Sequence, residues 1–269
     1  MALARDRAIL LKRYPFGESS LVVHLCAREH GRLHLIAKGI FRPTSRYFAA
    51  LDLFDTLEVE WVNDPRRDLS NLRMASILRR RSGIPAHLDR YFAGASLLEL
   101  ADLASRPAQP DPGLFDLVER ALDALEDGAA PADACLVAFE LGFLHNLGLA
   151  PSLETCAACG GPAGPVDADE ARSAFSAGAG GRLCRACAEE ARSSGRRVGT
   201  MPIQVLADAR RLLDRGPGAA AELGGERLDR VRDFAGRFLD YHLETQPRTH
   251  RAFLSVPNRN APGAVSEAG

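Results

Sequence analysis

Two pairs of cysteines constrain the fold of this chain more than any other feature. The pairs are Cys156-Ala-Ala-Cys159 and Cys184-Arg-Ala-Cys187, and 24 residues separate them. A tight turn can aim two thiols three positions apart at one ion, and two such turns give a tetrahedron of thiolates, which suits Zn²⁺. Gly160 follows the first pair, where the chain must reverse. The sequence therefore predicts one structural zinc ion held by Cys156, Cys159, Cys184 and Cys187.

Other roles for these cysteines fit less well. Disulfides are typical of small secreted domains, and the opening Met-Ala-Leu-Ala-Arg-Asp-Arg has no apolar signal segment. A thioredoxin-type site needs one pair beside a βαβ pattern, and a catalytic zinc keeps a coordination position open, which four thiolates would close. The remaining Cys26 and Cys135 stand in apolar runs and are interpreted as small buried hydrophobes.

The charge is divided unevenly along the chain. The 269 residues are 46% hydrophobic and 26% charged, as in an ordinary globular protein, and no apolar run reaches membrane-spanning length. Residues 1–81 carry 15 Lys/Arg against 9 Asp/Glu, a net charge of +6, whereas the remainder has a net charge of −7. This asymmetry favours a front end that binds a polyanion and a neutral to acidic body.

The first 81 residues are predicted to be strands. Short β-rich runs, some with alternating polar and apolar residues, are separated by turns and have no helical pattern between them. The expected strands are 9–14, 21–26, 32–38, 51–61 and 69–78. Five short strands predict a small closed barrel of the OB type, and a five-stranded SH3-like barrel is the alternative on strand number alone.

Cations and aromatic rings are interleaved in one connector of this region, between residues 38 and 48. Single-stranded nucleic acid needs this combination, because cations follow the phosphates while rings stack on bases. Two adjacent arginines, Arg66 and Arg67, stand in the turn before the last expected strand. In OB folds this turn borders the ligand groove. Each arginine alone is more simply a solvated side chain, but the group favours nucleic acid. The candidate DNA-binding residues are Arg13, Arg32, His34, Lys38, Phe41, Arg42, Arg46, Arg66 and Arg67.

From Pro85 onward apolar residues recur at helical spacing. Five helices are expected. Three of them cover residues 86–105, 133–147 and about 225–245. The other two run from a cap at Asp111-Pro112 to about Gly128, and from a cap at Thr200–Pro202 to Arg215. Residues 193–199 are expected to be a linker. The predicted domains are an OB fold at 1–81, the two parts of a helical domain at 82–152 and 193–256, a zinc module at 153–192 and a disordered tail at 257–269. The fold class is therefore α+β and multidomain.

Motifs of nucleotide-binding and hydrolytic enzymes are absent from the sequence. It has no GxxxxGK[ST], HExxH, GxSxG or GxGxxG pattern in a suitable context, and its seven histidines are scattered. We therefore predict a protein that is not an enzyme. A zinc-dependent hydrolase would need an open metal position, and an RNA-binding or transcription-associated protein could be built from the same barrel and cysteine module.

Three segments resemble the bacterial RecO family of DNA repair proteins. They are Leu11-Lys-Arg-Tyr-Pro-Phe-Gly-Glu-Ser-Ser-Leu21 with Glu29-His-Gly-Arg32, the run from Phe143 through Pro151 to Gly160, and the end from Tyr241 to Leu254. Each segment alone is modestly specific, but their order along the chain is highly specific.

This resemblance implies a non-enzymatic recombination mediator. Proteins of this kind bind single- and double-stranded DNA, anneal complementary strands and associate with RecR. They also engage the C-terminal tail of the single-strand-binding protein and help to load RecA onto coated DNA. The resemblance further implies that zinc supports the fold, that the barrel contacts DNA, and that the protein is cytoplasmic and associated with the nucleoid.

Overall fold

The structure is a computed structural model that describes residues 2–40, 45, 50–63, 69–164, 171–243 and 249. The chain forms two compact units, Met1–Asp127 and Gly128–Gly269. Among the described residues, the first unit contains five strands and three helices. The second contains three strands and four helices over its described residues, with two short 3₁₀ turns, Ala177–Ala179 and Pro217–Glu222.

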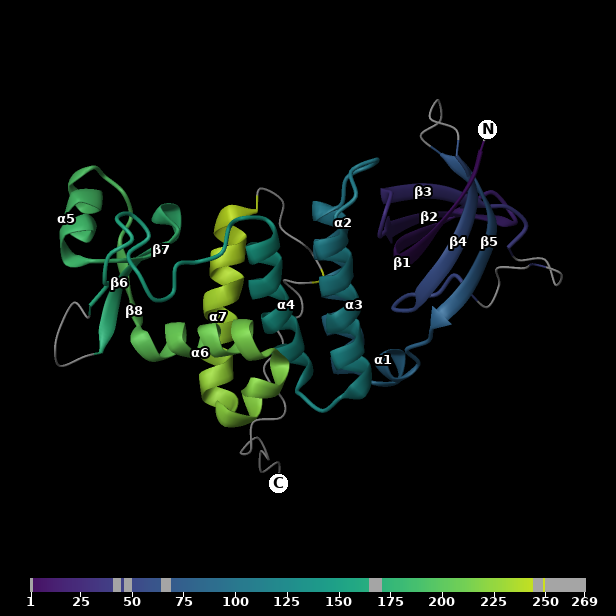
Figure 1. Cartoon of the computed structure of the whole chain (residues 1–269). Helices are drawn as coiled ribbons and strands as arrows, with labels where there is room; N and C mark the ends of the chain where they lie inside the picture. Colours follow the sequence, from purple (N-terminus) through teal and green to yellow (C-terminus); the bar gives the residue numbers. More distant parts are fainter. Residues whose placement is uncertain are drawn as a thin grey trace, which may run out of the picture. The chain divides into compact units, whose positions relative to one another are not determined.

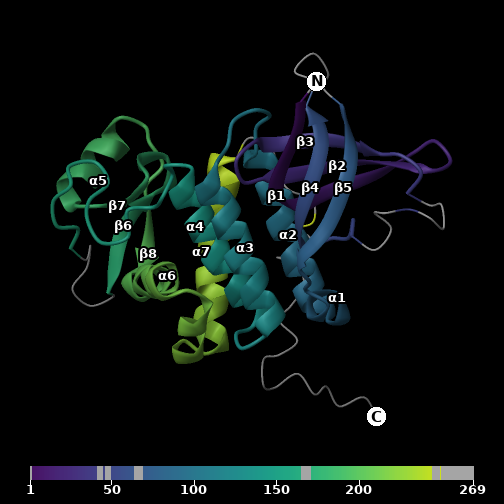
Figure 2. The same cartoon turned by 45° about the vertical axis from the view of Figure 1, so that its right-hand side comes forward.

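The five strands of the first unit form a closed barrel in the order β1-β2-β3-β5-β4, and β4 pairs with β1 to close it (Figures 1 and 2). The pairing of β3 with β5 is parallel and the others are antiparallel. The barrel is of the OB type, so the predicted fold class is confirmed. The strands are β1 (Ala2–Phe16), β2 (Ser20–Ala27), β3 (Gly31–Ala37), β4 (Thr56–Asn63) and β5 (Ser70–Arg79).

Alternation along the strands fills the barrel. Leu21, Val23 and Leu25 of β2 point inward with Trp61 of β4, and all four are buried. A register shift between Leu10 and Lys12 of β1 changes which residues face inward from there on. The intervening residues of β2 face outward, toward the helices of the first unit or toward solvent.

The strand expected at 51–61 begins only at Thr56. Phe54 has a left-handed backbone, with φ of 77°, so the extended conformation cannot run through it. Its ring is nevertheless buried and packs edge-on to Tyr91, and an added Cβ at Gly94 would lie 2.8 Å from the Phe54 ring. Burial of a large ring therefore holds a turn that sequence alternation could not reveal.

The first unit also contains α1 (Gly83–Ala86), α2 (Leu88–Ala104) and α3 (Pro112–Asp127). The expected cap of α3 is present, because the Asp111 carboxylate accepts a hydrogen bond of 2.9 Å from the Leu114 N–H. Along the part of the chain that the structure describes, no helix combines the length and apolarity needed to cross a membrane.

The second unit is built on α4 (Ala132–Asn146), α6 (Ile203–Arg215) and α7 (Gly225–His242). Two expectations are wrong here. Residues 199–202 are not linker and helix cap but strand β8 (Gly199–Pro202), because they pair with β6. Helix α6 therefore begins only at Ile203. The last helix ends at His242, three residues before its expected end.

The cysteine module lies within this unit. A three-stranded sheet has the order β7-β6-β8, formed by β6 (Arg172–Ser176), β7 (Gly181–Leu183) and β8, and α5 (Arg185–Ser193) follows β7. Phe175 of β6 packs edge-on to Phe234 and Phe238 of α7, which attaches the sheet to that helix. The module's own core consists of small residues and one leucine: Cys156, Ala163, Ala174, Leu183, Ala188 and Ala191.

Candidate metal centre and nucleic-acid interface

The four cysteines of the two CxxC pairs converge on one point. Their Sγ atoms all lie within 4.8 Å of one another, and the Sγ atoms of Cys159 and Cys184 are 4.0 Å apart. Tetrahedral zinc with Zn–S bonds of ~2.3 Å separates its sulfur ligands by about 3.8 Å. The donor set and its spacing therefore fit a four-thiolate metal ion.

Two different local structures bring the pairs together. In the first pair, the Gly160 N–H donates to the Cys156 carbonyl, and the Cys156 N–H donates to the Gly161 carbonyl, both at 2.8 Å. Gly160 has φ of 73°, a conformation that glycine adopts without strain. In the second pair, Cys184 is the N-cap of α5 and Cys187 lies in its first turn. The tight turn at Cys156–Gly161, called the first knuckle below, thus faces the N-terminus of α5. The partial positive charge at this helix end favours thiolates.

The thiols influence one another electrostatically. Burial raises the pKa of Cys156, but hydrogen bonds from the backbone N–H groups of Cys184, Cys159 and Ala158 outweigh it and lower the pKa to about 6. Hydrogen bonds with the Cys184, Cys156 and Cys159 side chains raise the pKa of Cys187 to about 12. The cluster therefore ionises readily at one sulfur but resists further charge, and a divalent cation would offset that repulsion.

Arg182 holds the first knuckle to the sheet, a role that sequence reasoning missed. Its side chain is buried, and it donates to the Ser173 hydroxyl at 3.0 Å, to the Leu153 carbonyl at 3.3 Å and to the Ala163 carbonyl. Burial lowers the pKa of this guanidinium. A buried cation satisfied by carbonyls on both sides of Cys156 fixes the loop that carries the first two sulfurs.

The other two cysteines are buried, as expected. The Cys26 and Cys135 side chains are thiols, and they are 3% and 1% exposed. Burial raises the pKa of Cys26 to about 11, so its thiol stays protonated at neutral pH and behaves as a small apolar group.

Four of the candidate DNA-binding residues lie in the described part of the barrel. Arg13 donates to the Leu51 carbonyl at 2.8 Å and lies 3.1 Å from the Asp52 carboxylate. Arg32 lies beside Asp102 of α2, His34 stacks on the His24 ring at 4.1 Å, and Lys38 is exposed after β3. The remaining candidates, Phe41, Arg42, Arg46, Arg66 and Arg67, lie outside the described residues.

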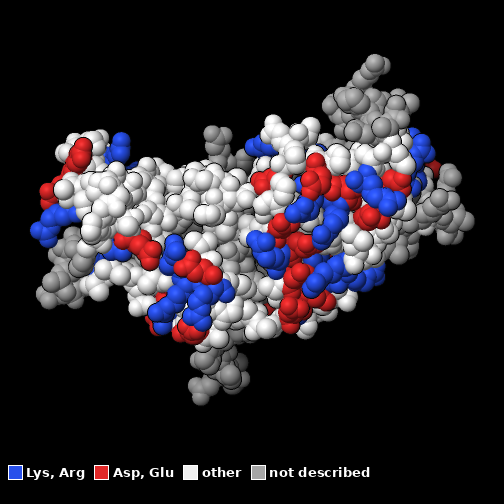
Figure 3. Space-filling view, viewed as in Figure 1, with Lys and Arg blue, Asp and Glu red and all other residues white. Residues whose placement is uncertain are grey.

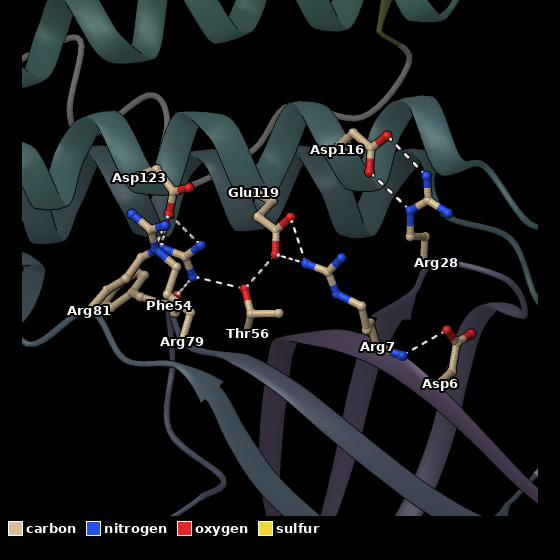
Figure 4. A network of polar contacts seen from close by, with 10 residues as sticks. All are labelled: Asp6, Arg7, Arg28, Phe54, Thr56, Arg79, Arg81, Asp116, Glu119 and Asp123. Carbon is tan, nitrogen blue, oxygen red and sulfur yellow. Dashed lines mark hydrogen bonds and ion pairs between the residues drawn. The ribbon is translucent and has the colours of Figure 1, made fainter.

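An acidic stripe on α3 binds basic residues of the barrel (Figure 4). Arg7 Nη2 lies 2.7 and 2.9 Å from the Glu119 carboxylate oxygens, and Glu119 also accepts from the Thr56 hydroxyl at 2.9 Å. Arg28 contacts both oxygens of Asp116, at 3.1 and 3.3 Å, and lowers the pKa of that carboxyl. The 3-4-3 spacing of the stripe is visible in the sequence and could have revealed it. The stripe consists of Asp116, Glu119, Asp123 and Glu126.

Two further arginines meet Asp123 of this stripe. Arg79 Nε is 2.8 Å from the carboxylate, and Arg81 Nε donates to it at 2.7 Å. Arg81 is fully buried and also donates to the Phe54 carbonyl and the Thr56 hydroxyl, at 2.7 and 3.1 Å. It therefore joins the segment after β5 to the start of β4 and to α3 through one side chain.

Most of the basic residues described in the barrel are thus already paired with carboxylates. Arg5 meets Glu58 and Glu60, and Lys12 lies 2.7 Å from Asp102. Figure 3 shows the result, because blue and red side chains are intermingled over the barrel and α3. The net charge of +6 in residues 1–81 overstates the cationic surface, since several of the balancing acids lie outside this range, in α2 and α3.

Comparison with known proteins identifies the family. The protein-family model described as Recombination protein O N terminal matches residues 1–81 of this chain. The family model described as Recombination protein O C terminal matches residues 85–252. The chain belongs to the RecO family. It is 35% identical to the DNA repair protein RecO of Anaeromyxobacter dehalogenans strain 2CP-1, over 90% of this chain and 92% of that protein. It is 36% identical to the DNA repair protein RecO of Anaeromyxobacter sp. strain K, over 87% of this chain and 89% of that protein. The resemblance drawn from the sequence is confirmed.

Proposed function

We propose that this RecO family member is a recombination mediator that binds DNA through its barrel and catalyses no bond chemistry. It would bind single- and double-stranded DNA, anneal strands, associate with RecR and the tail of the single-strand-binding protein, and help to load RecA, in the cytoplasm at the nucleoid. The observation that carries the proposal is a family match over nearly the whole chain to proteins named for DNA repair, on a chain that begins with an OB-type barrel.

Charge pairing narrows where DNA would bind. Because most described cations of the barrel face carboxylates, the candidates for phosphate contact are Lys38 and the arginines of the two connectors, 38–50 and 64–69. The parallel pairing of Leu35 with Ser70 and of Ile36 with Asn71 brings the end of β3 beside the start of β5. The described flanks of the two connectors are therefore neighbours, and strand 3 and the connector between strands 4 and 5 belong to the surface on which OB folds bind oligonucleotides.

The binding mechanism would be electrostatic. Arginine and lysine neutralise phosphates and release condensed counterions, so affinity falls steeply as salt rises. This term carries no sequence information, which suits a protein that acts wherever DNA is single-stranded.

We further propose that the metal is Zn²⁺, one ion per chain, and that it supports the fold. Four thiolates favour zinc over Mg²⁺ or Ca²⁺ and leave no open position for a substrate. The module's core of small residues provides little hydrophobic stabilisation, so metal binding would supply much of its folding free energy. The direct check is metal analysis of the purified protein together with X-ray absorption at the zinc edge, where a four-sulfur shell is expected.

The function is tested by anisotropy titration of labelled single-stranded DNA at several salt concentrations. The variant Arg42→Gln/Arg46→Gln is expected to bind more weakly and to lower the slope of log K against log salt by about 1.4, at ~0.7 per phosphate contact. The matched control is Arg5→Gln/Arg79→Gln, which removes the same formal charge from arginines paired with carboxylates.

Equal effects of the two double variants would contradict this location of the DNA site. Salt-independent binding would contradict the mechanism, and stronger binding to RNA than to DNA of equal length would favour the RNA-binding alternative.

A further inference from the structure

The outer face of β1, β2 and β3 carries a row of rings that the charge argument does not use. Strand register aligns Lys12, His24 and His34 in one row and Tyr14, Val22 and Ile36 in the next, with Phe16 opposite Ser20 beyond them. Residues directly opposite one another on paired strands share a face of the sheet. The face therefore runs from Lys12 outward to Phe16 at the β1–β2 turn.

The rings on this face contact one another. The Tyr14 and His24 rings meet edge-on at 5.5 Å between centroids, and the His24 ring stacks on the His34 ring at 4.1 Å. The inner rings are partly buried, whereas Tyr14 is 47% exposed and Phe16 is 54% exposed. Within the described residues of the barrel, these are the two exposed Phe, Tyr or Trp side chains.

Helix α2 and the segment after it cover only the inner part of the face. Asp102 of α2 lies 2.7 Å from the Lys12 ammonium and 3.9 Å from the His24 ring. The Arg32 N–H donates to the Arg106 carbonyl at 2.9 Å, which ties β3 to the segment after α2. The half-buried histidine beneath Tyr14 thus braces a ring that remains open to solvent.

We propose that Tyr14 and Phe16 form a stacking platform for unpaired nucleobases. This inference rests on the proposed function, because it places the bases of a bound strand next to Lys38, which that proposal assigns to phosphate contact. The face belongs to strands 2 and 3 and the β1–β2 turn, which bind oligonucleotides in OB folds. Aromatic rings stack on any base, and exposed rings beside cations are the usual elements of such a surface.

One exposed cation beside the platform, Lys38, favours a strand of nucleic acid as the occupant. Ile36 lies in the same row as Tyr14, and Lys38, exposed, follows two residues later. The acid nearest in sequence is Glu18 in the β1–β2 turn, which is exposed. An apolar peptide would need no cation at this position, whereas a DNA strand places a phosphate beside each stacked base.

The platform would separate single strands from duplexes. Bases in a duplex are stacked on their neighbours and present no free face, so only the phosphate contacts would remain for double-stranded DNA. Preference for a single strand would then come from Tyr14 and Phe16, and salt dependence from the connector arginines.

The test compares a labelled oligothymidylate with an abasic strand of equal length, which keeps the phosphates and lacks the bases. The variants are Tyr14→Ala, Phe16→Ala and both together. The control is Phe92→Ala, which removes a partly exposed ring from α2. Each platform variant is expected to weaken oligothymidylate binding about tenfold, with the salt slope and the affinity for the abasic strand unchanged. Tyr14→Phe should bind like the wild type, since the ring is retained.

Three results would overturn the inference. The wild type could bind the oligothymidylate and the abasic strand with equal affinity. The platform variants could lose the same affinity for both strands, or lose no affinity for either. If the wild type binds both strands equally with a steep salt slope, the proposed function stands and the platform is wrong. If the wild type binds neither strand, the proposed function itself fails. The fluorescence of Trp61, the single tryptophan and a buried residue of the barrel, verifies that each variant is folded.

Discussion

Arg81 is a buried cation whose contacts reach residues far away in the sequence. Its guanidinium donates to the Phe54 carbonyl, the Thr56 hydroxyl and the Asp123 carboxylate, at 2.7, 3.1 and 2.7 Å. Such a group is costly to remove from water, so it persists only where each donor finds an acceptor. Its environment therefore depends on the barrel and α3 being folded together.

Replacing Arg81 with methionine is expected to lower the free energy of unfolding of the first unit by about 3 kcal/mol. The substitution leaves the buried Phe54 carbonyl without its guanidinium donor and removes a partner of Asp123. Arg79→Met is the matched control, because Arg79 pairs with the same carboxylate but its side chain is 50% exposed. The control should cost less than about 1 kcal/mol. Urea titration followed by Trp61 fluorescence measures both, and equal losses would mean that burial does not set the cost.

At the scale of single residues, the sequence predicted the roles of residues that lie close together along the chain. It did not predict the roles of residues whose partners are far away in the sequence. Two thiols three positions apart disclose a knuckle without any knowledge of the fold. In contrast, Arg7 and Glu119 are separated by 112 positions, so nothing near Arg7 indicates that its charge is neutralised. Arg182 was missed for the same reason, because most of its acceptors are backbone carbonyls, which every residue has.

At the scale of elements, β7 shows how the backbone positions the cysteine knuckle. Ser152 donates its N–H to the Gly180 carbonyl at 2.8 Å, and the Arg182 N–H donates to the Ser152 carbonyl at 3.0 Å. This exchange crosses over Gly181, where an added Cβ would lie 2.5 Å from the Ser152 oxygen. The segment entering the first CxxC pair therefore lies directly against the strand that leads to the second.

Gly181→Ala is expected to loosen the metal site, since backbone cannot move aside as a flexible side chain can. The rate of zinc release to a chromogenic chelator should rise about tenfold or more, the usual consequence of disturbing residues that orient ligands. Gly180→Ala is the control, because Gly180 has φ of 86° but nothing within 4 Å of an added Cβ. It should bear only the conformational cost of ~1 kcal/mol. Similar release rates for the two variants would contradict this account of the close approach.

Periodicity predicted most of the elements, and local exceptions account for the differences. Strands β2, β3 and β5 and the helices α3, α4 and α7 lie close to their expected ranges, whereas β1 begins at Ala2, seven residues before its expected start. The start of β4 was misplaced because Phe54 turns the chain while keeping its ring buried. Strand β8 was missed because four residues are too few for alternation to show, and its pairing with β6 is a tertiary contact.

At the scale of the whole molecule, the chain divides its stabilising interactions between two units. The first is held by the barrel core and the acidic stripe of α3, and it contains none of the four clustered cysteines. The second combines a helical core, in which Phe139 stacks near Phe143, with a module whose core is made of small residues. The two units should therefore respond differently to loss of the metal.

Removing the metal with a chelator, or by Cys187→Ser, is expected to unfold the cysteine module and leave the barrel folded. The apolar core of the module is too small to offset the chain entropy of its loops without the ion. Hydrogen exchange should accelerate across residues 152–202, while the β-strands of the first unit stay protected and Trp61 fluorescence is unchanged. Cys135→Ala is the control, since it alters a buried cysteine outside the cluster. A change in Trp61 emission on metal loss would show that the metal stabilises the barrel as well, and it would contradict the separation of the two units. Retained protection in the module would instead mean that the thiols are not its main support.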